Sequence, residues 1–252
     1  QDAAVLVETE CQPGGCTAQF RDPHLHPDLV AQAGLTDGLS GQRVVVQGLG
    51  NVGFHAAKAL ADLAKEEIEA FLKRAAELKE VHRKGRAQLS QAGKSLGLLF
   101  DKPSTRTRVS FETGMNQLGG SALFLSPRDI QLGRGEPLED SARVISRMVD
   151  IVMIRTYEHD KIELFAEYSR APVINALTDL YHPCQLLADM QTYVEHRGDI
   201  RGKTVTWVGD GNNMCHSWAN AAKLLDFSLR IATPAGYEPD PEIVADRQGR
   251  IS

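Results

Sequence analysis

Short apolar segments of strand length alternate with longer segments of helical period from about residue 63 onwards, and this alternation constrains the fold more than any other feature of the chain. Two strands joined by a helix normally run in parallel, because the helix returns the chain to the edge from which it started. The sequence therefore predicts an α/β fold with a parallel sheet covered by helices. The expected strands are 94–100, 121–125, 150–155 and 173–176, and the expected helices are 64–84, 103–118, 137–149, 161–169 and one that begins at Pro183.

Polar residues follow three of the expected strands. The segment PSTRTR comes after 94–100, Arg155 ends 150–155, and the turn 182–185 comes after the fourth strand. In a parallel sheet the carboxyl ends of the strands lie at one edge, and ligands bind in the crevice beyond it. We therefore expect these three loops to converge on one site.

The segment PSTRTRVSFE (103–112) lies at the predicted start of a helix and has the composition of an anion site. The first backbone N–H groups of a helix are unpaired and carry partial positive charge, so a phosphate is stabilised there. A capped surface helix with solvated arginines is the plainer alternative. The side chains that would bind a dianion are the hydroxyls of Ser104, Thr105 and Thr107 and the guanidinium of Arg106 or Arg108.

The turn HPCQ after the fourth strand suits a carbonyl group. The imidazole of His182 and the amide of Gln185 flank the first turn of a helix, and Arg155 could stabilise negative charge on a carbonyl oxygen. Cys184 is better explained as a small packed residue than as a nucleophile, because no base or cation pairs with it by sequence. A phosphate site beside a carbonyl site describes an acyl phosphate.

Charge and composition exclude several classes of partner. The net charge of −5 at pH 7 provides no basic surface for nucleic acid or for an anionic membrane. No apolar run approaches the roughly 18 residues of a membrane span. The four cysteines, Cys11, Cys16, Cys184 and Cys215, have no metal-ligand spacing, so we expect a cytoplasmic protein with no bound metal.

The first 62 residues follow a different pattern. After a loop-rich start, RVVVQGLGNVG places Gly48, Gly50 and Gly53 in the spacing of a dinucleotide-binding turn. This segment, about 35–60, resembles the start of the coenzyme domain of glutamate and leucine dehydrogenases. A second strand with a terminal acidic residue should follow, but the next residues are helical in period. We expect a partial Rossmann-like β-α segment, joined near residue 62 to a different protein, without coenzyme binding.

Four motifs in order, PSTRTRVSFE, DIQLGRGEPLEDSARV, LTDLYHPCQLLAD and WVGDGNNMCHSWANAAKLL, resemble the aspartate/ornithine carbamoyltransferase family from about residue 62 to the end. Both the DIQLGRGE and GDGNN motifs resemble the ornithine type of this family. Together the two resemblances imply three domains: 1–62 a dehydrogenase-like fragment with a loop-rich start, 63–200 a carbamoyl-phosphate-binding domain, and 201–252 a partial ornithine-binding α/β domain.

The same resemblance implies a set of site residues. It assigns the phosphate of carbamoyl phosphate to the STRT segment, and the carbamoyl oxygen and amide to an arginine and the HPCQ turn. It also implies a homotrimer in which a glutamine reaches a neighbouring subunit, and an asparagine that holds ornithine. These residues are Ser104, Thr105, Arg106, Thr107, Gln131, Arg155, His182, Pro183, Cys184, Gln185 and Asn213, with Asn212 as the alternative to Asn213.

The implied reaction is transfer of the carbamoyl group from carbamoyl phosphate to the δ-amine of ornithine, without a cofactor. Arg106, Arg155 and His182 would be its catalytic residues. Because the chain lacks an initiator Met and stops within the second domain, we expect a fragment with impaired activity. The alternatives are a carbamoyltransferase for putrescine or N-acylated ornithine, an NAD(P)-dependent amino-acid dehydrogenase fragment, and a non-catalytic binding fragment.

Overall fold

The computed structural model describes residues 5–8, 43–46, 65–86, 89–126, 135–245 and 249–252. The chain divides into two compact units, one of residues Gly50–Gln191 and one that combines Gln1–Leu49 with Thr192–Ser252. The three-domain division expected from the sequence stays a prediction.

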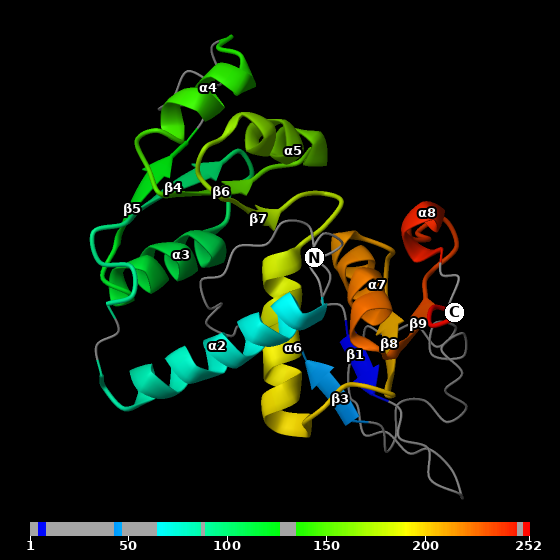
Figure 1. The fold of residues 1–252 in the computed structure, drawn as a ribbon. Coiled ribbons are helices and arrows are strands. Elements are labelled where there is room, and N and C mark those ends of the chain that lie inside the picture. The colour runs from blue at the N-terminus through cyan, green and yellow to red at the C-terminus, as the bar shows by residue number, and fades with distance from the viewer. Residues whose placement is uncertain (1–4, 9–42, 47–64, 87–88, 127–134, 246–248) are drawn as a thin grey trace, which may run out of the picture. The chain divides into compact units, whose positions relative to one another are not determined.

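The first unit is built on a parallel sheet of order β5-β4-β6-β7 (Figure 1). Its strands are β4 (Ser95–Phe100), β5 (Ser121–Leu125), β6 (Ile151–Arg155) and β7 (Val173–Leu177). Phe100 lies opposite Arg155, which in turn lies opposite Leu177, so β4, β6 and β7 end at the same level. The predicted parallel sheet is confirmed.

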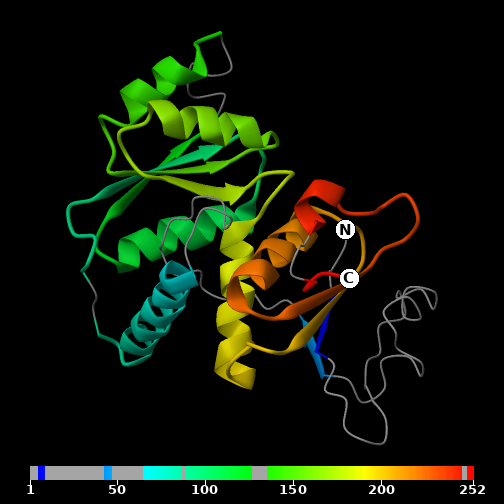
Figure 2. The same cartoon turned by 45° about the vertical axis from the view of Figure 1, so that its right-hand side comes forward.

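Helices cover both faces of this sheet (Figure 2). One face packs against α3 (Thr105–Gln117), and the other packs against α4 (Leu138–Ile145) and α5 (His159–Tyr168). Successive side chains of a strand point to opposite faces, which explains the two cores. The core against α3 includes Leu96, Leu98, Phe100, Phe111, Met115, Met153 and Ile174, and the opposite core includes Leu99, Ala142, Val152, Ile154, Ile162 and Phe165.

The two remaining helices that lie wholly or partly in this unit begin close to the predicted residues. They are α2 (Lys65–Arg83) and α6 (Pro183–Arg197), and proline at the first position of α6 has no amide hydrogen that would need a partner there. The prediction 137–149 was too long for α4. Beyond Ser146 the backbone makes turns instead, with Arg147 N–H donating to Val144 O and Met148 N–H to Ile145 O.

The second unit contains a sheet of order β3-β1-β8-β9. Strands β8 (Thr204–Val208) and β9 (Ser228–Ala232) are parallel and connected by α7 (Asn213–Leu225). A short helix, α8 (Pro241–Val244), follows. Trp218 of α7 meets Phe227 edge to face, with ring centroids 5.8 Å apart. Both rings are buried, so α7 is anchored by aromatic packing.

The strand predicted before the glycine-rich turn is confirmed as β3 (Arg43–Val46). It pairs antiparallel with β1 (Val5–Glu8), a strand that the sequence did not predict, whereas strands of a dinucleotide-binding unit pair in parallel. The glycines of the QGLGNVG turn lie outside the described residues. Within the described part of the chain, no helix has both the length and the apolar composition that crossing a membrane requires.

Truncating a core residue of β4 should destabilise the first unit. Leu98 is fully buried, so Leu98→Ala should lower the free energy of unfolding by roughly 2–5 kcal/mol through lost burial and a residual cavity. The same substitution at Leu123 of β5, which is 51% exposed, should cost less than about 1 kcal/mol. Urea unfolding of both variants checks this, and equal costs would contradict the assignment of the core.

Candidate functional site

The start of α3 has the structure of a capped anion site. Ser104 is the N-cap, with extended backbone, and its hydroxyl accepts the N–H of Thr107 at 3.2 Å. The Ser104 hydroxyl also donates to Thr107 Oγ1 at 3.0 Å. Thr105 and Arg106, in the first helical turn, are exposed. Both readings of the motif, helix cap and anion site, are compatible with this geometry.

The two arginines of the motif differ in their surroundings. Arg108 donates its Nε–H to Glu112 Oε1 at 2.9 Å, and its guanidinium carbon lies 3.7 Å from the centre of the Phe124 ring. Arg108 is therefore held along α3 by a carboxylate and an aromatic face. Arg106 lies close enough to Arg155 to affect its titration, so Arg106 is the guanidinium that belongs to the site.

Arg155, the last residue of β6, connects the phosphate loop to the rest of the site. Its Nη1 is 3.4 Å from Thr107 Oγ1, and its buried Nε has no hydrogen-bond partner among the described residues. Burial, and then the charge of Arg106, lower the pKa of the Arg155 guanidinium from its ordinary value. The positive charges of Arg106 and the partly buried Arg155 therefore oppose each other, and a bound anion would relieve this repulsion.

The His182 side chain lies just before α6, at the carboxyl edge of the sheet. Burial, and then the positive charge of Arg155, lower the pKa of His182 to about 3. The imidazole is consequently neutral at physiological pH. A neutral ring can donate one N–H to a carbonyl oxygen without adding a third positive charge beside the two arginines.

The two residues that follow Pro183 behave differently. The Cys184 thiol is buried and donates to Asn175 O at 3.3 Å, and burial raises the pKa of Cys184 to about 12. It is a packed thiol, in line with the expectation that it is no nucleophile. Gln185 donates its Nε2–H to Asp189 Oδ1 at 2.9 Å, so the amide oxygen of Gln185 remains to accept a hydrogen bond.

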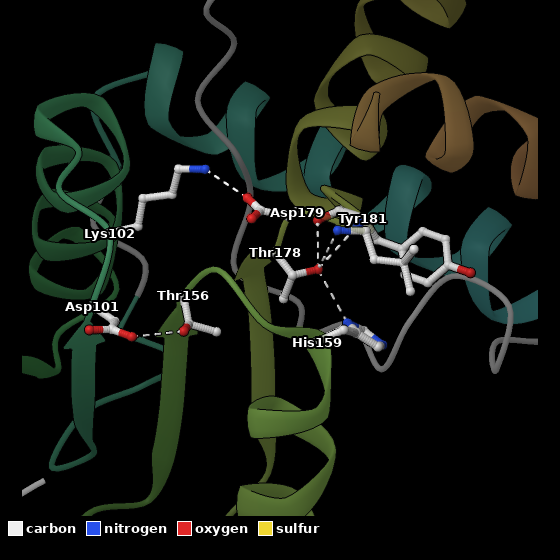
Figure 3. A network of polar contacts seen from close by, with 8 residues as sticks. Asp101, Lys102, Thr156, His159, Thr178, Asp179 and Tyr181 are labelled. Atoms are coloured by element: carbon white, nitrogen blue, oxygen red, sulfur yellow. Dashed lines mark hydrogen bonds and ion pairs between the residues drawn. The ribbon is translucent and has the colours of Figure 1, made fainter. Parts of the chain in front are cut away.

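Polar side chains beyond the strand ends, which the sequence analysis did not single out, tie the three loops together (Figure 3). The Lys102 ammonium pairs with Asp179 at 2.8 Å. The Asp101 carboxylate accepts from Thr156 Oγ1 and from Lys161, each at 3.1 Å. Their signal in the sequence is position: the first two residues after β4 are charged, and so is the second residue after β7.

The other predicted residues lie elsewhere. Asn212 caps α7 and accepts the N–H groups of Met214 and Cys215, whereas Asn213 is the first helical residue. Both belong to the second unit. Gln131, and the glycines Gly48, Gly50 and Gly53, lie outside the described residues. Within the described ranges, no group of three His, Cys, Asp or Glu side chains could hold a metal ion.

The described geometry thus brings together Arg106, Thr107, Arg155 and His182 at the ends of β4, β6 and β7. Hydroxyls, two guanidiniums and a helix start offer an anion several charged and neutral donors. A neutral imidazole and an amide oxygen lie next to them on α6 and its preceding turn. Such a site can bind a phosphate and polarise a neighbouring carbonyl group.

Family models and relatives point to one family. The model for the carbamoyl-phosphate-binding domain of aspartate/ornithine carbamoyltransferases matches residues 56–195, and the Asp/Orn-binding domain model of the same family matches residues 201–252. The ornithine carbamoyltransferase of Psychrobacter cryohalolentis is 64% identical over 185 residues, which are 73% of this chain and 61% of that relative. The chain spans about three fifths of the length of the curated relatives it matches.

Solved structures agree. The ornithine carbamoyltransferase of Burkholderia thailandensis is 54% identical with a TM-score of 0.73, over 77% of this chain and 67% of that one. The enzyme of Pyrococcus furiosus is 45% identical with a TM-score of 0.71, over 76% of this chain and 63% of that one. Since the first family model alone covers more than half of it, the chain belongs to the aspartate/ornithine carbamoyltransferase family.

Proposed function

We propose that this chain carries the carbamoyl-phosphate site of an ornithine carbamoyltransferase, which transfers a carbamoyl group to the δ-amine of ornithine and releases citrulline and phosphate. The observation that carries the proposal is the contact of the Arg155 guanidinium with Thr107 at the capped start of α3, beside the charge of Arg106 and a neutral His182. The names of the relatives support the choice of ornithine over putrescine, N-acylated ornithine or a dehydrogenase substrate.

The phosphate end of the ligand binds at the start of α3. Ser104, Thr105 and Thr107 supply hydroxyl and backbone donors, and Arg106 supplies charge. As the bond between the carbamoyl carbon and the phosphate oxygen breaks, negative charge grows on the leaving phosphate. Arg106 and the helix start stabilise that charge, so the phosphate loop lowers the barrier as well as binding the ligand.

The carbamoyl end binds between Arg155 and the turn 182–185. Neutral His182 and the Arg155 guanidinium donate to the carbamoyl oxygen, which becomes an oxyanion when the amine attacks. The oxygen of Gln185, oriented by its bond to Asp189, accepts from the carbamoyl NH₂ group. Pro183 and Cys184 form the rigid base of this turn. The neutral amine adds to the carbonyl carbon and a tetrahedral intermediate forms. The bond to the phosphate oxygen then breaks, and the proton lost by the amine nitrogen leaves with the phosphate, without a covalent enzyme intermediate.

The remaining assignments are parts of the same proposal. Asn213 of α7 holds the amino-acid substrate, because Asn212 is engaged as the helix cap. Gln131 reaches the site of a neighbouring subunit in a homotrimer. We further place the enzyme in the cytoplasm and in arginine biosynthesis, where citrulline is consumed.

Removing the charge of Arg106 tests the phosphate site, with Arg108 as a matched control in the same motif. Arg106→Gln should weaken carbamoyl phosphate binding at least about thirtyfold, because a charged donor to the phosphate is lost. Arg108→Gln should change the affinity less than about threefold, since Arg108 is engaged by Glu112 and Phe124. Ligand-induced protection against thermal unfolding measures both affinities. Equal losses in the two variants would contradict the assignment.

The substrate is tested by product formation. With carbamoyl phosphate present, the gene product should form citrulline from ornithine and no carbamoylated product from putrescine, as measured by a colorimetric ureido assay. Activity confined to putrescine would overturn the choice of amine. Tight NAD(P) binding that is lost on Gly50→Ala would instead favour the dehydrogenase alternative.

The neutral state of His182 predicts a pH dependence of stability. The ordinary pKa of histidine is 6.5 and that of His182 is about 3. Between pH 3 and pH 6.5, His182 is therefore protonated in the unfolded chain and neutral in the folded protein. The unsubstituted protein should therefore lose more unfolding free energy than the His182→Gln variant as the pH falls from 6.5 towards 3. Above pH 6.5 the stabilities of the two proteins should depend on pH in the same way. Urea unfolding at several pH values checks this. A gain in relative stability on acidification would contradict a neutral His182.

A further inference from the structure

An ion pair reaches directly from the phosphate loop to the loop that carries His182. Lys102 lies two residues before the helix cap Ser104, and Asp179 lies three residues before His182. The Lys102 Nζ and Asp179 Oδ1 atoms are 2.8 Å apart (Figure 3). Each partner thus stands next to one half of the proposed site.

Strand order makes this pair structurally significant. Strand β6 lies between β4 and β7, so the loops that follow β4 and β7 start roughly 10 Å apart, two strand spacings. Backbone bonds tie each outer loop to the β6 loop: Lys102 N–H donates to Arg155 O at 3.2 Å, and Asp179 N–H donates to Tyr157 O at 2.8 Å. The ion pair spans the two outer loops above β6.

The lysine is held in place by its surroundings. Its ammonium lies 4.8 Å from the centre of the Tyr157 ring. The backbone carbonyl of Tyr157 accepts the N–H of Asp179, so the same residue contacts both partners of the ion pair. The side chains of Lys102 and Asp179 are 31% and 61% exposed. An ion pair exposed to this degree adds little to global stability. The main consequence of the ion pair is therefore the distance that it fixes between the loop after β4 and the loop after β7.

The segment between Asp179 and His182 transmits this position. Thr178 Oγ1 accepts the N–H groups of Leu180 and Tyr181, at 3.3 and 3.1 Å. The Thr178 N–H donates to Tyr181 O at 2.8 Å, which closes the turn from the other side. His159 Nδ1 lies 3.2 Å from Thr178 Oγ1, and the His159 ring packs edge to face against the Tyr181 ring. A shift of Asp179 would therefore be carried along a closed turn to His182.

We propose that Lys102 and Asp179 are positioning residues, whose ion pair sets the distance between the phosphate-binding start of α3 and the carbonyl-binding His182 turn. The inference rests on the proposed function. A ligand that binds both halves, such as carbamoyl phosphate, depends on this distance. Inorganic phosphate, which binds one half, does not.

Because Lys102 and Asp179 have opposite charges, substituting each of them distinguishes a positioning role from a purely electrostatic effect on anion binding. If the pair acted only through its field, loss of Lys102 would weaken anion binding and loss of Asp179 would strengthen it. A positioning role predicts that either loss weakens carbamoyl phosphate binding. It also predicts that the double variant is no worse than the poorer single variant, because the second substitution has no pair left to break.

The test uses Asp179→Ala, Lys102→Met and the double variant, with calorimetric titration of freshly prepared carbamoyl phosphate and of inorganic phosphate. We expect Asp179→Ala to bind carbamoyl phosphate about fivefold more weakly or worse, while binding inorganic phosphate at least as tightly as the unsubstituted protein. Lys102→Arg, which keeps the pair, should restore most of the carbamoyl phosphate affinity lost in Lys102→Met.

A matched control is available at the opposite edge of the sheet. Lys94 pairs with Asp150 at 2.7 Å before the starts of β4 and β6, so Lys94→Met removes a comparable ion pair away from the site. It should leave both affinities unchanged. Unchanged or tighter carbamoyl phosphate binding by Asp179→Ala would overturn the inference while leaving the proposed function intact. Failure of the unsubstituted protein to bind either ligand would instead overturn the proposed function.

Discussion

The parallel register of β4, β6 and β7 is the constraint on which the site depends. Phe100, Arg155 and Leu177 lie level across three strands, so the three loops that follow leave the sheet at one edge. A shift of β6 by one residue would turn Arg155 to the other face of the sheet and away from Thr107. The apolar cores on both faces oppose such a shift, because the buried apolar side chains of these strands are divided between the two cores.

That register also brings together groups that repel or lack partners when no anion is bound. Arg155 is partly desolvated, is repelled by the charge of Arg106, and has a buried Nε without a partner among the described residues. The same charge helps to keep His182 neutral. Arg155 thus supplies positive charge to the site and also helps to keep the neighbouring His182 a neutral hydrogen-bond donor. The arrangement costs stability in the folded chain, and functional sites are where such costs are commonly retained.

The sequence predicted the parallel sheet, its strands and most helix starts, because buried strands and amphipathic helices have distinct periods. It also predicted that Arg155 and the His182 turn would converge on STRTR, since the carboxyl ends of parallel strands share an edge. The residue pattern by itself did not decide between Arg106 and Arg108, and only the family resemblance favoured Arg106. That choice depends on Glu112 and on Phe124, and the contact with Phe124 crosses from α3 to β5.

The same limit applies to the Lys102–Asp179 pair. Its partners are 77 residues apart, and no period or motif relates them. Their contact depends on strand order, because β6 has to lie between β4 and β7 for one lysine side chain to reach across it. Sequence spacing can therefore identify the groups that touch a ligand, whereas the groups that set distances between them emerge only from the topology of the sheet. For a ligand with two ends, the second kind decides whether both ends can bind at once.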